Sequence, residues 1–322
     1  MANENIKTRV LILSDTHSAS PTENLSSPFR TPLPSADVLV HCGDLTMVGL
    51  MSEYKRVMKM LQGVDAQLKL VIAGNHDISL DETYYLRKGK FMQRLKEADE
   101  DMPRRARELW TGEKARTAGI IYLDEGVHEF KLKNGARLRV YASPYQPEFC
   151  DWAFPYWRNQ DRFNPSHQIT PNAVPIAVNP VPDFPNIDIM MTHGPPMGIL
   201  DQTTRREHVG CEHLLRAARR CRPQLHCFGH IHEGWGAERV TWKVNNENEV
   251  EWKEYVKEKE AIVVDHEKIE EDRAVFVDLG NGSEKPLRWG EETLMVNASI
   301  MTQTYRPSQG PWVVDLDLEK AE

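Results

Sequence analysis

The stretch "VLILSDTH" (residues 10–17) passes from four aliphatic residues into Ser-Asp-Thr-His, so an aspartate and a histidine stand two positions apart. A short aliphatic run that contains β-branched residues predicts a buried β-strand. Four further stretches repeat this design of a buried strand with a polar end: "VLVHCGD" (38–44), "LVIAGNHD" (70–77), "IMMTHGPP" (189–196) and "LHCFGHIH" (225–232). The chain therefore carries five predicted strands whose carboxyl ends are all polar.

Helical patterns alternate with these strands. Apolar residues recur at helical spacing over residues 48–61, and residues 210–221 end in "RAARRC", whose cations suit the negative end of a helix dipole. This alternation predicts an α/β sandwich. Residues 84–110 are charged and are predicted to be helical, with a break at Pro103. Further strands are predicted at 127–132, 137–141, 294–300 and 312–318, the last two as a hairpin that closes a second sheet.

The length predicts a single domain over residues 1–322. A chain of 322 residues exceeds a typical domain, but α/β domains reach this size when loops are inserted. The predicted insertions are 164–186, which is rich in proline, and 243–290, which is dominated by Glu, Lys, Asn and Asp. We interpret the second insertion as a solvated surface segment, with a partner-binding arm as the alternative.

Composition and charge bear on the class of function. A net charge of −8 gives no general basis for attracting nucleic acid. No run approaches the roughly 18 apolar residues of a membrane helix, and the N-terminal residues do not resemble a signal peptide. The five cysteines are odd in number and form no CxxC pair, which argues against a disulfide framework. We therefore expect a cytoplasmic protein without a membrane segment.

The polar strand ends indicate metal binding. In open α/β sheets, ligands bind outside the carboxyl ends of the strands, so groups that follow separate strands can converge. Residues two apart at a strand end point the same way, so Asp15 with His17, and His230 with His232, can each present two ligands to one place. Asp, Asn and imidazole together suit Mn, Fe, Zn or Mg. One such pair alone is usually a turn or core residue, but five polar ends together predict a metal site.

Other residues near these motifs are interpreted as structural. His41 and His226 lie inside their predicted strands, and free cysteines such as Cys42 and Cys227 are usually small buried hydrophobes. A zinc knuckle built from Cys227 and the two histidines of "GHIH" would leave the other four segments unexplained. Both cysteines are therefore kept out of the predicted site.

The ordered series "SDTH", "GDLT", "GNHD", "THGPP" and "GHIH" resembles the motif pattern of the calcineurin-like metallophosphoesterase superfamily. Additional stretches such as "SPYQPEFCDWAF" and "VNAS" are similar to its branch of small metallophosphoesterase-domain-containing proteins. The resemblance implies a four-layer α-β-β-α sandwich with two mixed sheets and an active site at the carboxyl ends of the strands.

The resemblance also implies a set of site residues. Seven side chains would hold two metal ions: Asp15, His17 and His232 for the first ion, Asn75, His193 and His230 for the second, and Asp44 as a bridge between them. His76 corresponds to the histidine that the family uses near the phosphate, and it is expected to be catalytic rather than a ligand.

This site implies a metal-dependent phosphoester hydrolase. Two divalent ions, Mn, Fe, Zn or Mg with Mn expected to support activity in vitro, would activate a hydroxide for in-line attack on phosphorus. His76 would protonate the departing alkoxide or bind the phosphate. Only the branch resemblance favours a phosphodiesterase, with a nucleotide among the candidate substrates. The alternatives are a phosphomonoesterase and a weakly active or inactive metal-binding scaffold that docks a protein partner through 243–290.

The aromatic stretch 145–163 allows two interpretations. Its exposed rings could form a wall of the active cleft, on which flat groups stack. Trp152 and Phe154 could instead pack onto the sheet as ordinary core residues. The sequence leaves both interpretations open.

Overall fold

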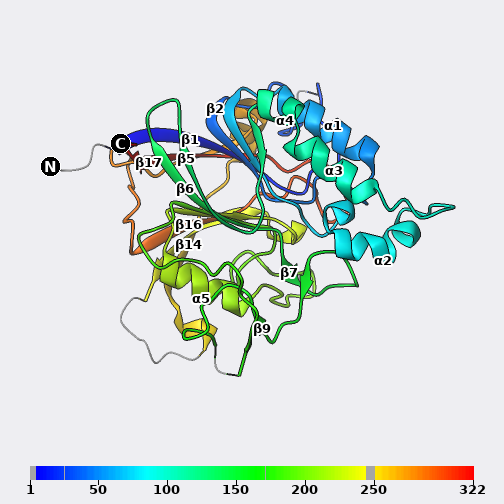
Figure 1. Ribbon diagram of the computed structural model, residues 1–322. Helices are drawn as coiled ribbons and strands as arrows, with labels where there is room; N and C mark the ends of the chain where they lie inside the picture. Colours follow the sequence, from blue (N-terminus) through cyan, green and yellow to red (C-terminus); the bar gives the residue numbers. More distant parts are fainter. Residues whose placement is uncertain (1–4, 25, 171, 244–250) are drawn as a thin grey trace.

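The computed structural model describes residues 5–24, 26–170, 172–243 and 251–322. One sheet has six strands and lies in the upper half of Figure 1. In spatial order its strands are β15 (Val275–Asp278), β17 (Trp312–Glu319), β1 (Asn5–Leu13), β2 (Ala36–His41), β3 (Ala66–Val71) and β4 (Ile120–Tyr122). The pair β1–β17 is antiparallel and the other neighbours are parallel, so the sheet is mixed.

The second sheet has seven strands. In spatial order they are β14 (Val256–Ala261), β13 (Gly236–Trp242), β16 (Glu292–Asn297), β12 (Leu225–Phe228), β11 (Ile189–Thr192), β6 (Arg137–Ser143) and β5 (Gly126–Lys131). Its centre is parallel from β16 to β6, and antiparallel strands close both edges. Four two-residue strands lie between β6 and β11: β7 (Gln146–Pro147), β8 (Pro155–Tyr156), β9 (Gln160–Asp161) and β10 (Val174–Pro175).

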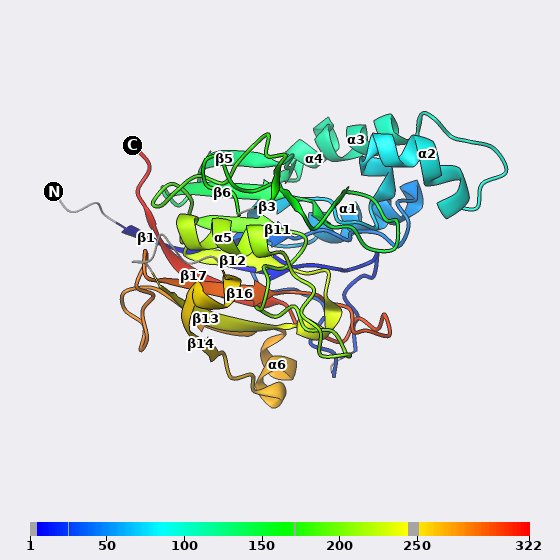
Figure 2. The ribbon, with the colours of Figure 1, turned by 90° about the horizontal axis from the view of Figure 1, so that it is seen from below.

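Helices cover the outer faces of the two sheets (Figures 1 and 2). The six-stranded sheet is covered by α1 (Met51–Gln62), α2 (Glu82–Met92), α3 (Met102–Thr111) and α4 (Glu113–Thr117). The seven-stranded sheet is covered by α5 (Glu212–Cys221), and α6 (His266–Asp272) precedes β15. Three short 3-10 helices complete the list: η1 (Ile78–Leu80), η2 (His232–Gly234) and η3 (Trp252–Glu254). No described helix is both long and apolar enough to span a bilayer.

The side chains of β1 show how the layers are held together. Successive residues of a strand point to opposite faces. Val10 and Ile12 pack into the core between the two sheets, whereas Leu11 and Leu13 pack into the core under the helices. A third core lies between the seven-stranded sheet and α5. The structure therefore confirms the expected four-layer sandwich with two mixed sheets.

The predicted hairpin of 294–300 and 312–318 is wrong. The strand β16 lies in the seven-stranded sheet, whereas β17 lies between β15 and β1 in the other sheet. The reason is burial, since Trp312 and Val314 fill the core between the sheets and Val313 fills the core under the helices. A strand with apolar side chains on both faces buries the most apolar surface when it lies inside a sheet that is covered by helices on one face and by a second sheet on the other.

Two local predictions also need correction. Pro103 does not interrupt a helix but lies in the first turn of α3, where its missing N–H breaks no hydrogen bond.

The charged segment 243–290 is not merely a solvated loop, because β14 extends one sheet and β15 extends the other. Its residues Ile269 and Val275 reach the core between the sheets. The described part of this segment is therefore built into the fold, and residues 244–250 lie outside the described residues.

Candidate metal centre

The carboxyl ends of β1, β2, β3, β11 and β12 point toward the end of the molecule that carries α2 (Figures 1 and 2). The two sheets are joined at this end by a parallel bridge between Ser14 and Ser299. The backbone N–H of Ser14 donates to the carbonyl of Ala298 at 3.0 Å, and the N–H of Ile300 donates to the carbonyl of Ser14 at 2.9 Å. The loops that follow strands of both sheets therefore meet at one place.

Four of the predicted ligands have left-handed backbone conformations. The φ angles of Asp15, His17, Asp44 and His230 are 50°, 43°, 49° and 66°. This region is sparsely populated by residues other than glycine and costs about 1–3 kcal/mol per residue. Such conformations persist only where the surroundings impose them, and they cluster at functional sites.

Asp15, His17 and His232 form the first cluster. The Nε2 atom of His232 lies 3.3 Å from Oδ1 of Asp15 and 3.4 Å from Nε2 of His17. All three side chains are buried. Their donor atoms are therefore as close to one another as ligands that share one metal ion.

Asn75, His193 and His230 gather in a second cluster. The Oδ1 atom of Asn75 lies 2.9 Å from Nε2 of His193. The rings of His193 and His230 are 5.0 Å apart, and donor atoms of both lie within 4.8 Å of a carboxylate oxygen of Asp44. The structure thus places the second predicted set together as well.

Asp44 stands between the clusters and presents a different oxygen to each. Its Oδ2 lies 3.6 Å from Nε2 of His17, and its Oδ1 lies 3.4 Å from Nε2 of His193. The backbone N–H of His76 donates to Oδ1 at 2.9 Å. A carboxylate with one oxygen facing each cluster has a geometry in which it can bridge two ions.

Backbone carbonyls fix the orientation of three of these imidazoles. The Nδ1 atoms of His17, His193 and His232 lie at 2.9, 2.9 and 3.1 Å from carbonyl oxygens. The accepting carbonyls belong to Thr46, Cys42 and Thr302. Because a carbonyl only accepts, each Nδ1 must carry the hydrogen, and Nε2 faces the cluster with a free lone pair when the ring is neutral. Burial tends to lower the pKa of His232, but its hydrogen bond to Asp15 and the charge of that carboxylate raise it to about 9, so this ring must lose its Nε2 proton to bind a metal. This arrangement is typical of histidines that bind metals.

The electrostatics of the clusters favour a cation. Burial lowers the pKa of His17 and His230 well below the usual value and also lowers that of His193, so these rings are neutral. Burial raises the pKa of Asp44 to about 7. Burial also tends to raise the pKa of Asp15, but its hydrogen bond to His232 and the nearby histidines bring that pKa well below the usual value. A divalent cation held between these groups would supply the positive charge that buried carboxylates need.

The donor set fits a divalent metal ion. Nitrogen and oxygen donors in this mixture suit Mn, Fe, Zn or Mg. Cys42 and Cys227 are completely buried in the core between the sheets, so neither thiol belongs to the clusters. His41 and His226 are likewise buried, each 2.9 Å from a threonine hydroxyl. The four residues interpreted as structural therefore lie in the core.

The sequence profile of the calcineurin-like phosphoesterase family matches residues 8–234. The chain belongs to this family. It is 35% identical over 246 residues to metallophosphoesterase domain-containing protein 1 of Homo sapiens and of Mus musculus, which covers 74% of this chain and 65% of each relative. A UPF0046 protein of Caenorhabditis elegans is 32% identical over 208 residues, which covers 63% of this chain and 48% of the relative. The expected family and branch are thereby confirmed.

A solved phosphopantetheinyl hydrolase from Mycobacterium tuberculosis superposes with a TM-score of 0.39 and 13% identity over 75% of this chain and 86% of that chain. The chain spans about two thirds of the length of its human and mouse relatives.

In this calcineurin-like phosphoesterase, His76 lies beside the clusters. Its Nδ1 is 2.7 Å from the carbonyl oxygen of Met47 and therefore carries a hydrogen. A ring nitrogen of His76 lies within 4.8 Å of donor atoms of His17 and Asp44. Because Nδ1 is hydrogen-bonded to this carbonyl, Nε2 is the ring nitrogen that can take part in proton transfer. All eight predicted site residues are thus brought together.

Three residues at the site escaped the sequence analysis. The ring of Tyr305 lies 5.0 Å from that of His17 and 5.3 Å from that of His232, and Phe149 lies 6.2 Å from His230. Both rings are exposed, at 45% and 58%. The hydroxyl of Ser299 donates to Oδ2 of Asp15 at 3.0 Å. Tyr305 follows the predicted strand 294–300 and Ser299 lies inside it. Phe149 lies in the aromatic stretch 145–163, whose exposed rings were expected to form a wall of the active cleft under one of its two interpretations.

In the aromatic stretch 145–163, some residues pack in the core and one contacts the site, so each of the two interpretations applies to part of it. Phe154 is buried with Tyr145 in the core under the helices, as expected for a packing residue. Trp152 also packs against this core, and its ring stacks on His76, with ring centroids 4.0 Å apart and an interplanar angle of 28°. Trp157 is largely exposed. One tryptophan of the stretch therefore reaches the site directly.

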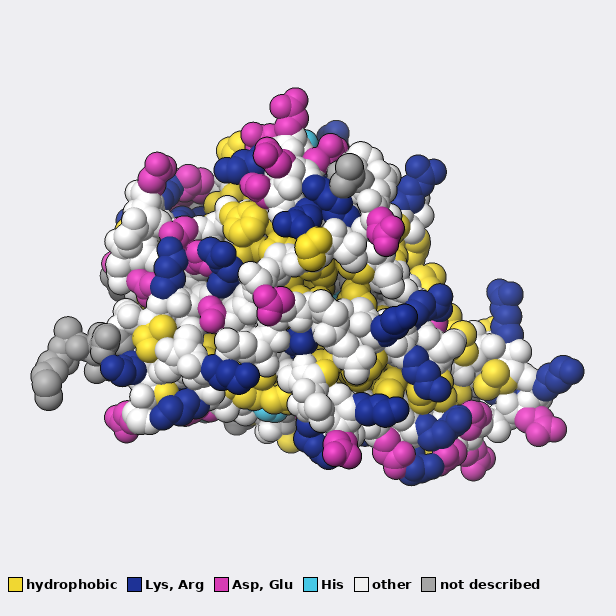
Figure 3. All heavy atoms as spheres, turned by 90° about the horizontal axis from the view of Figure 1, so that it is seen from above, with side chains coloured by type: hydrophobic (Ala, Val, Ile, Leu, Met, Phe, Trp, Pro, Cys, Tyr) yellow, Lys and Arg dark blue, Asp and Glu magenta, His cyan; other side chains and the backbone are white. Residues whose placement is uncertain are grey.

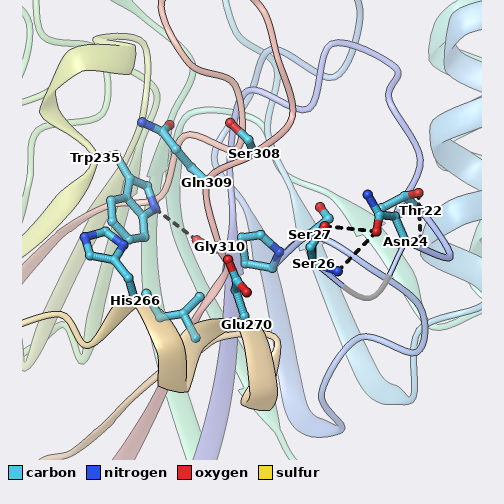
Figure 4. Close-up of a pocket in the computed structure, with 12 residues that line it drawn as sticks. Thr22, Asn24, Ser26, Ser27, Trp235, His266, Glu270, Ser308, Gln309 and Gly310 are labelled. Carbon is cyan, nitrogen blue, oxygen red and sulfur yellow. Dashed lines mark hydrogen bonds between the residues drawn. The ribbon is translucent and has the colours of Figure 1, made fainter.

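A separate pocket of about 640 Å³ opens between residues 22–28, α6 and residues 308–310 (Figure 4). None of the eight predicted site residues lines it. Two lining residues contact the site at the carbonyl of His232, to which the side-chain amide of Gln309 donates at 3.3 Å and the backbone N–H of Trp235 at 3.5 Å. The indole N–H of Trp235 donates to the carbonyl of Gly310 at 2.9 Å across the pocket wall. This pocket is thus a surface hollow next to the His232 loop and not the metal centre.

Proposed function

We propose that this calcineurin-like phosphoesterase is a phosphodiesterase with two divalent ions at the clusters. Asp15, His17 and His232 hold one ion, Asn75, His193 and His230 hold the other, and Asp44 bridges them. The observation that carries the proposal is that Asp44 turns one oxygen to His17 and the other to His193, at 3.6 and 3.4 Å. A mononuclear site would leave one of these histidines without a role.

Different residues of the chain have different roles in the proposed hydrolysis. Two divalent ions, when bound, acidify a water and neutralise charge on the phosphoryl group during in-line displacement. The carbonyls behind His17, His193 and His232 keep the Nε2 atoms directed at the ions. His76 directs Nε2 at the ester and, in the doubly protonated form of the ring, donates the Nε2 proton to the departing oxygen.

A small phosphodiester with a planar organic group is the proposed substrate. Phe149 and Tyr305 place exposed rings at opposite clusters, where a flat group such as a nucleobase can stack. The face of the molecule in Figure 3 interleaves basic and acidic side chains, and the net charge is −8. These charges favour a small molecule over a nucleic acid polymer.

We propose Mn²⁺ as the ion that supports activity in vitro and the cytoplasm as the compartment. Nitrogen and oxygen donors without thiolate accommodate Mn²⁺. All five cysteines are free thiols, which suits a reducing compartment.

The test is turnover with defined metals. The metal-free protein is loaded with Mn²⁺, Mg²⁺, Zn²⁺ or Fe²⁺ and assayed on bis(p-nitrophenyl) phosphate and on p-nitrophenyl phosphate, and bound metal is counted by mass spectrometry. We expect diester hydrolysis with Mn²⁺ and two ions per chain. The Asp44→Asn, His230→Ala double variant should lose both activity and metal, whereas His167→Ala, at an exposed histidine, should retain them. A wild type as inactive as the double variant would contradict the proposal, and turnover of the monoester alone would favour a phosphomonoesterase.

A further inference from the structure

The contact between Trp152 and His76 joins the two halves of the sandwich. Trp152 follows β7, which belongs to the connection between β6 and β11 of the seven-stranded sheet. His76 follows β3 of the six-stranded sheet. Figure 1 shows β7 beneath α2, at the end of the molecule where the strand ends meet. The two rings stack face to face with centroids 4.0 Å apart.

The stack completes the confinement of the His76 ring. One ring atom, Nδ1, donates to the carbonyl of Met47 at 2.7 Å. The edge of His17 meets the ring at 4.7 Å with an interplanar angle of 87°. Trp152 covers a face of the ring. A single hydrogen bond leaves an imidazole free to tilt about it, and the indole face restricts that tilt.

The segment that carries Trp152 is anchored to the element that follows His76. The carboxylate of Asp81 accepts the N–H of Tyr84, which caps α2, and also the N–H of Phe154 at 2.9 Å. The hydroxyl of Tyr84 donates to the carbonyl of Asp151 at 2.7 Å. Residues on both sides of Trp152 are thus tied to the same short stretch of chain. Asp151 and Phe154 have φ angles of 56° and 55°, so the turn is held in a conformation that it would not adopt alone.

We propose that Trp152 is a positioning residue for His76. The indole holds the imidazole plane so that Nε2 faces the ester at the metal centre, and Asp81 holds the indole in place. The role rests on the function proposed above. Trp152 does not itself touch the reacting atoms, so it acts on turnover through His76 rather than on substrate binding.

The first test compares Trp152→Ala and Trp152→Phe in the Mn²⁺-loaded full chain. A displaced catalytic group costs about 10- to 100-fold in rate, so Trp152→Ala should lower kcat by about that factor, with KM within about twofold of the wild-type value. Trp152→Phe supplies another ring face and should restore most of kcat. Phe91→Ala, at an aromatic residue of α2 that is 80% exposed, should match the wild type.

The second test is a double-mutant cycle. If Trp152 acts only through His76, Trp152→Ala should cause no further loss in a His76→Ala background. Losses that multiply, or a rise in KM with kcat unchanged, would overturn the positioning role. A wild type without turnover would contradict the proposed function itself, whereas an active wild type that Trp152→Ala leaves unchanged would contradict only the role of Trp152.

A third measurement is independent of activity. The stacked indole shields the ring protons of His76, so their NMR signals in the metal-free protein should lie upfield of the usual position. Trp152→Ala should remove this shift, and Phe91→Ala should preserve it. Unshifted His76 signals in the folded wild type would overturn the stacking and with it the proposal.

Discussion

Two buried histidines, His226 and His41, stay neutral in the folded protein. His226 is completely buried, and its Nε2 lies 2.9 Å from the hydroxyl of Thr192. Burial lowers its pKa to about 3. His41, packed the same way against Thr16, also has a pKa of about 3 because of burial. Both rings are neutral wherever the protein is folded above that pH.

These two histidines predict acid sensitivity. The unfolded chain takes up their protons below a pH of about 6.5 whereas the folded chain does so only near 3, so stability falls as the pH drops through this window. Each histidine contributes up to about 1.4 kcal/mol per pH unit. Urea unfolding of the metal-free protein from pH 7 to 4.5 should therefore show a shallower pH dependence for His226→Gln than for the wild type. His266→Gln, at an exposed histidine, should keep the wild-type slope, and equal slopes for all three proteins would contradict the prediction.

Tyr305 predicts an effect on substrate affinity. Stacking of a base on an aromatic ring contributes about 1–3 kcal/mol. Tyr305→Ala should therefore raise KM for a diester with a planar group by about 5-fold or more, while Tyr305→Phe stays close to the wild type. A diester with only small alkyl groups provides the comparison. An equal change in KM for both diesters would show that Tyr305 does not stack with the planar group.

At this scale the sequence predicted the eight site residues as a group. Asp15, His17 and the others each follow a buried strand, and strand ends converge by geometry. Tyr305 and Phe149 carry no such pattern, because loops bring them to the site. Their positions depend on contacts between segments that are distant in the sequence, and the local spacing of residues does not predict such contacts.

At the scale of elements, Asp77 cross-links the loops after β2 and β3. Its buried carboxylate accepts four hydrogen bonds of 2.8–3.0 Å, from the backbone N–H groups of Leu45, Thr46 and Gly74 and from the hydroxyl of Thr46. One loop carries Asp44, the predicted bridge between the two ions, and the other carries Asn75, a predicted ligand of the second ion. Asp77 therefore sets the distance between the proposed bridging carboxylate and a proposed ligand.

Asp77→Ala should weaken both folding and metal binding. Each buried donor left without a partner costs about 1–3 kcal/mol, so the free energy of unfolding should fall by at least about 3 kcal/mol. Urea unfolding measures this loss, and titration calorimetry with Mn²⁺ should show weaker binding to the folded variant. Glu53→Ala, which also removes a carboxylate that accepts loop N–H groups, is the matched control. Its Mn²⁺ affinity should stay near that of the wild type, and an unchanged affinity of Asp77→Ala would contradict the assigned role.

The elements themselves were predictable only where the pattern is strong. The parallel strands are apolar throughout and stand out from the sequence. The edge strands β14 and β15 each have one strand neighbour and carry charged residues, so their stretch resembled a solvated loop. The sheet to which β16 and β17 belong depends on long-range pairing, which periodicity does not encode.

At the scale of the whole molecule, the layers protect all cysteines but one. Cys42, Cys211, Cys221 and Cys227 are buried, and Cys150 is exposed. Burial raises the pKa of the Cys42 thiol well above its usual value and that of Cys211 to about 11. These thiols are neither accessible nor ionised at neutral pH.

Iodoacetamide should therefore label one thiol per folded chain and five after denaturation. Mass spectrometry of the intact protein counts the labels, and peptide mapping should place the native label at Cys150. Cys150→Ser should abolish native labelling without changing turnover. Rapid labelling of Cys42 or Cys227 in the folded protein would contradict the closed packing between the sheets.

The strand that completes the six-stranded sheet, β17, is the last of the described strands in sequence order. β17 lies between β1 and β15, so during translation β1 has no antiparallel neighbour until residues 312–319 have left the ribosome. Until then the edge of β1 has unpaired backbone N–H and C=O groups, and strands with such edges tend to aggregate. The bridge from Ser14 to Ser299 also forms only at this late stage. The proposed metal centre, at which this bridge joins the two sheets, is therefore expected to be complete only after residues 299–319 have been made.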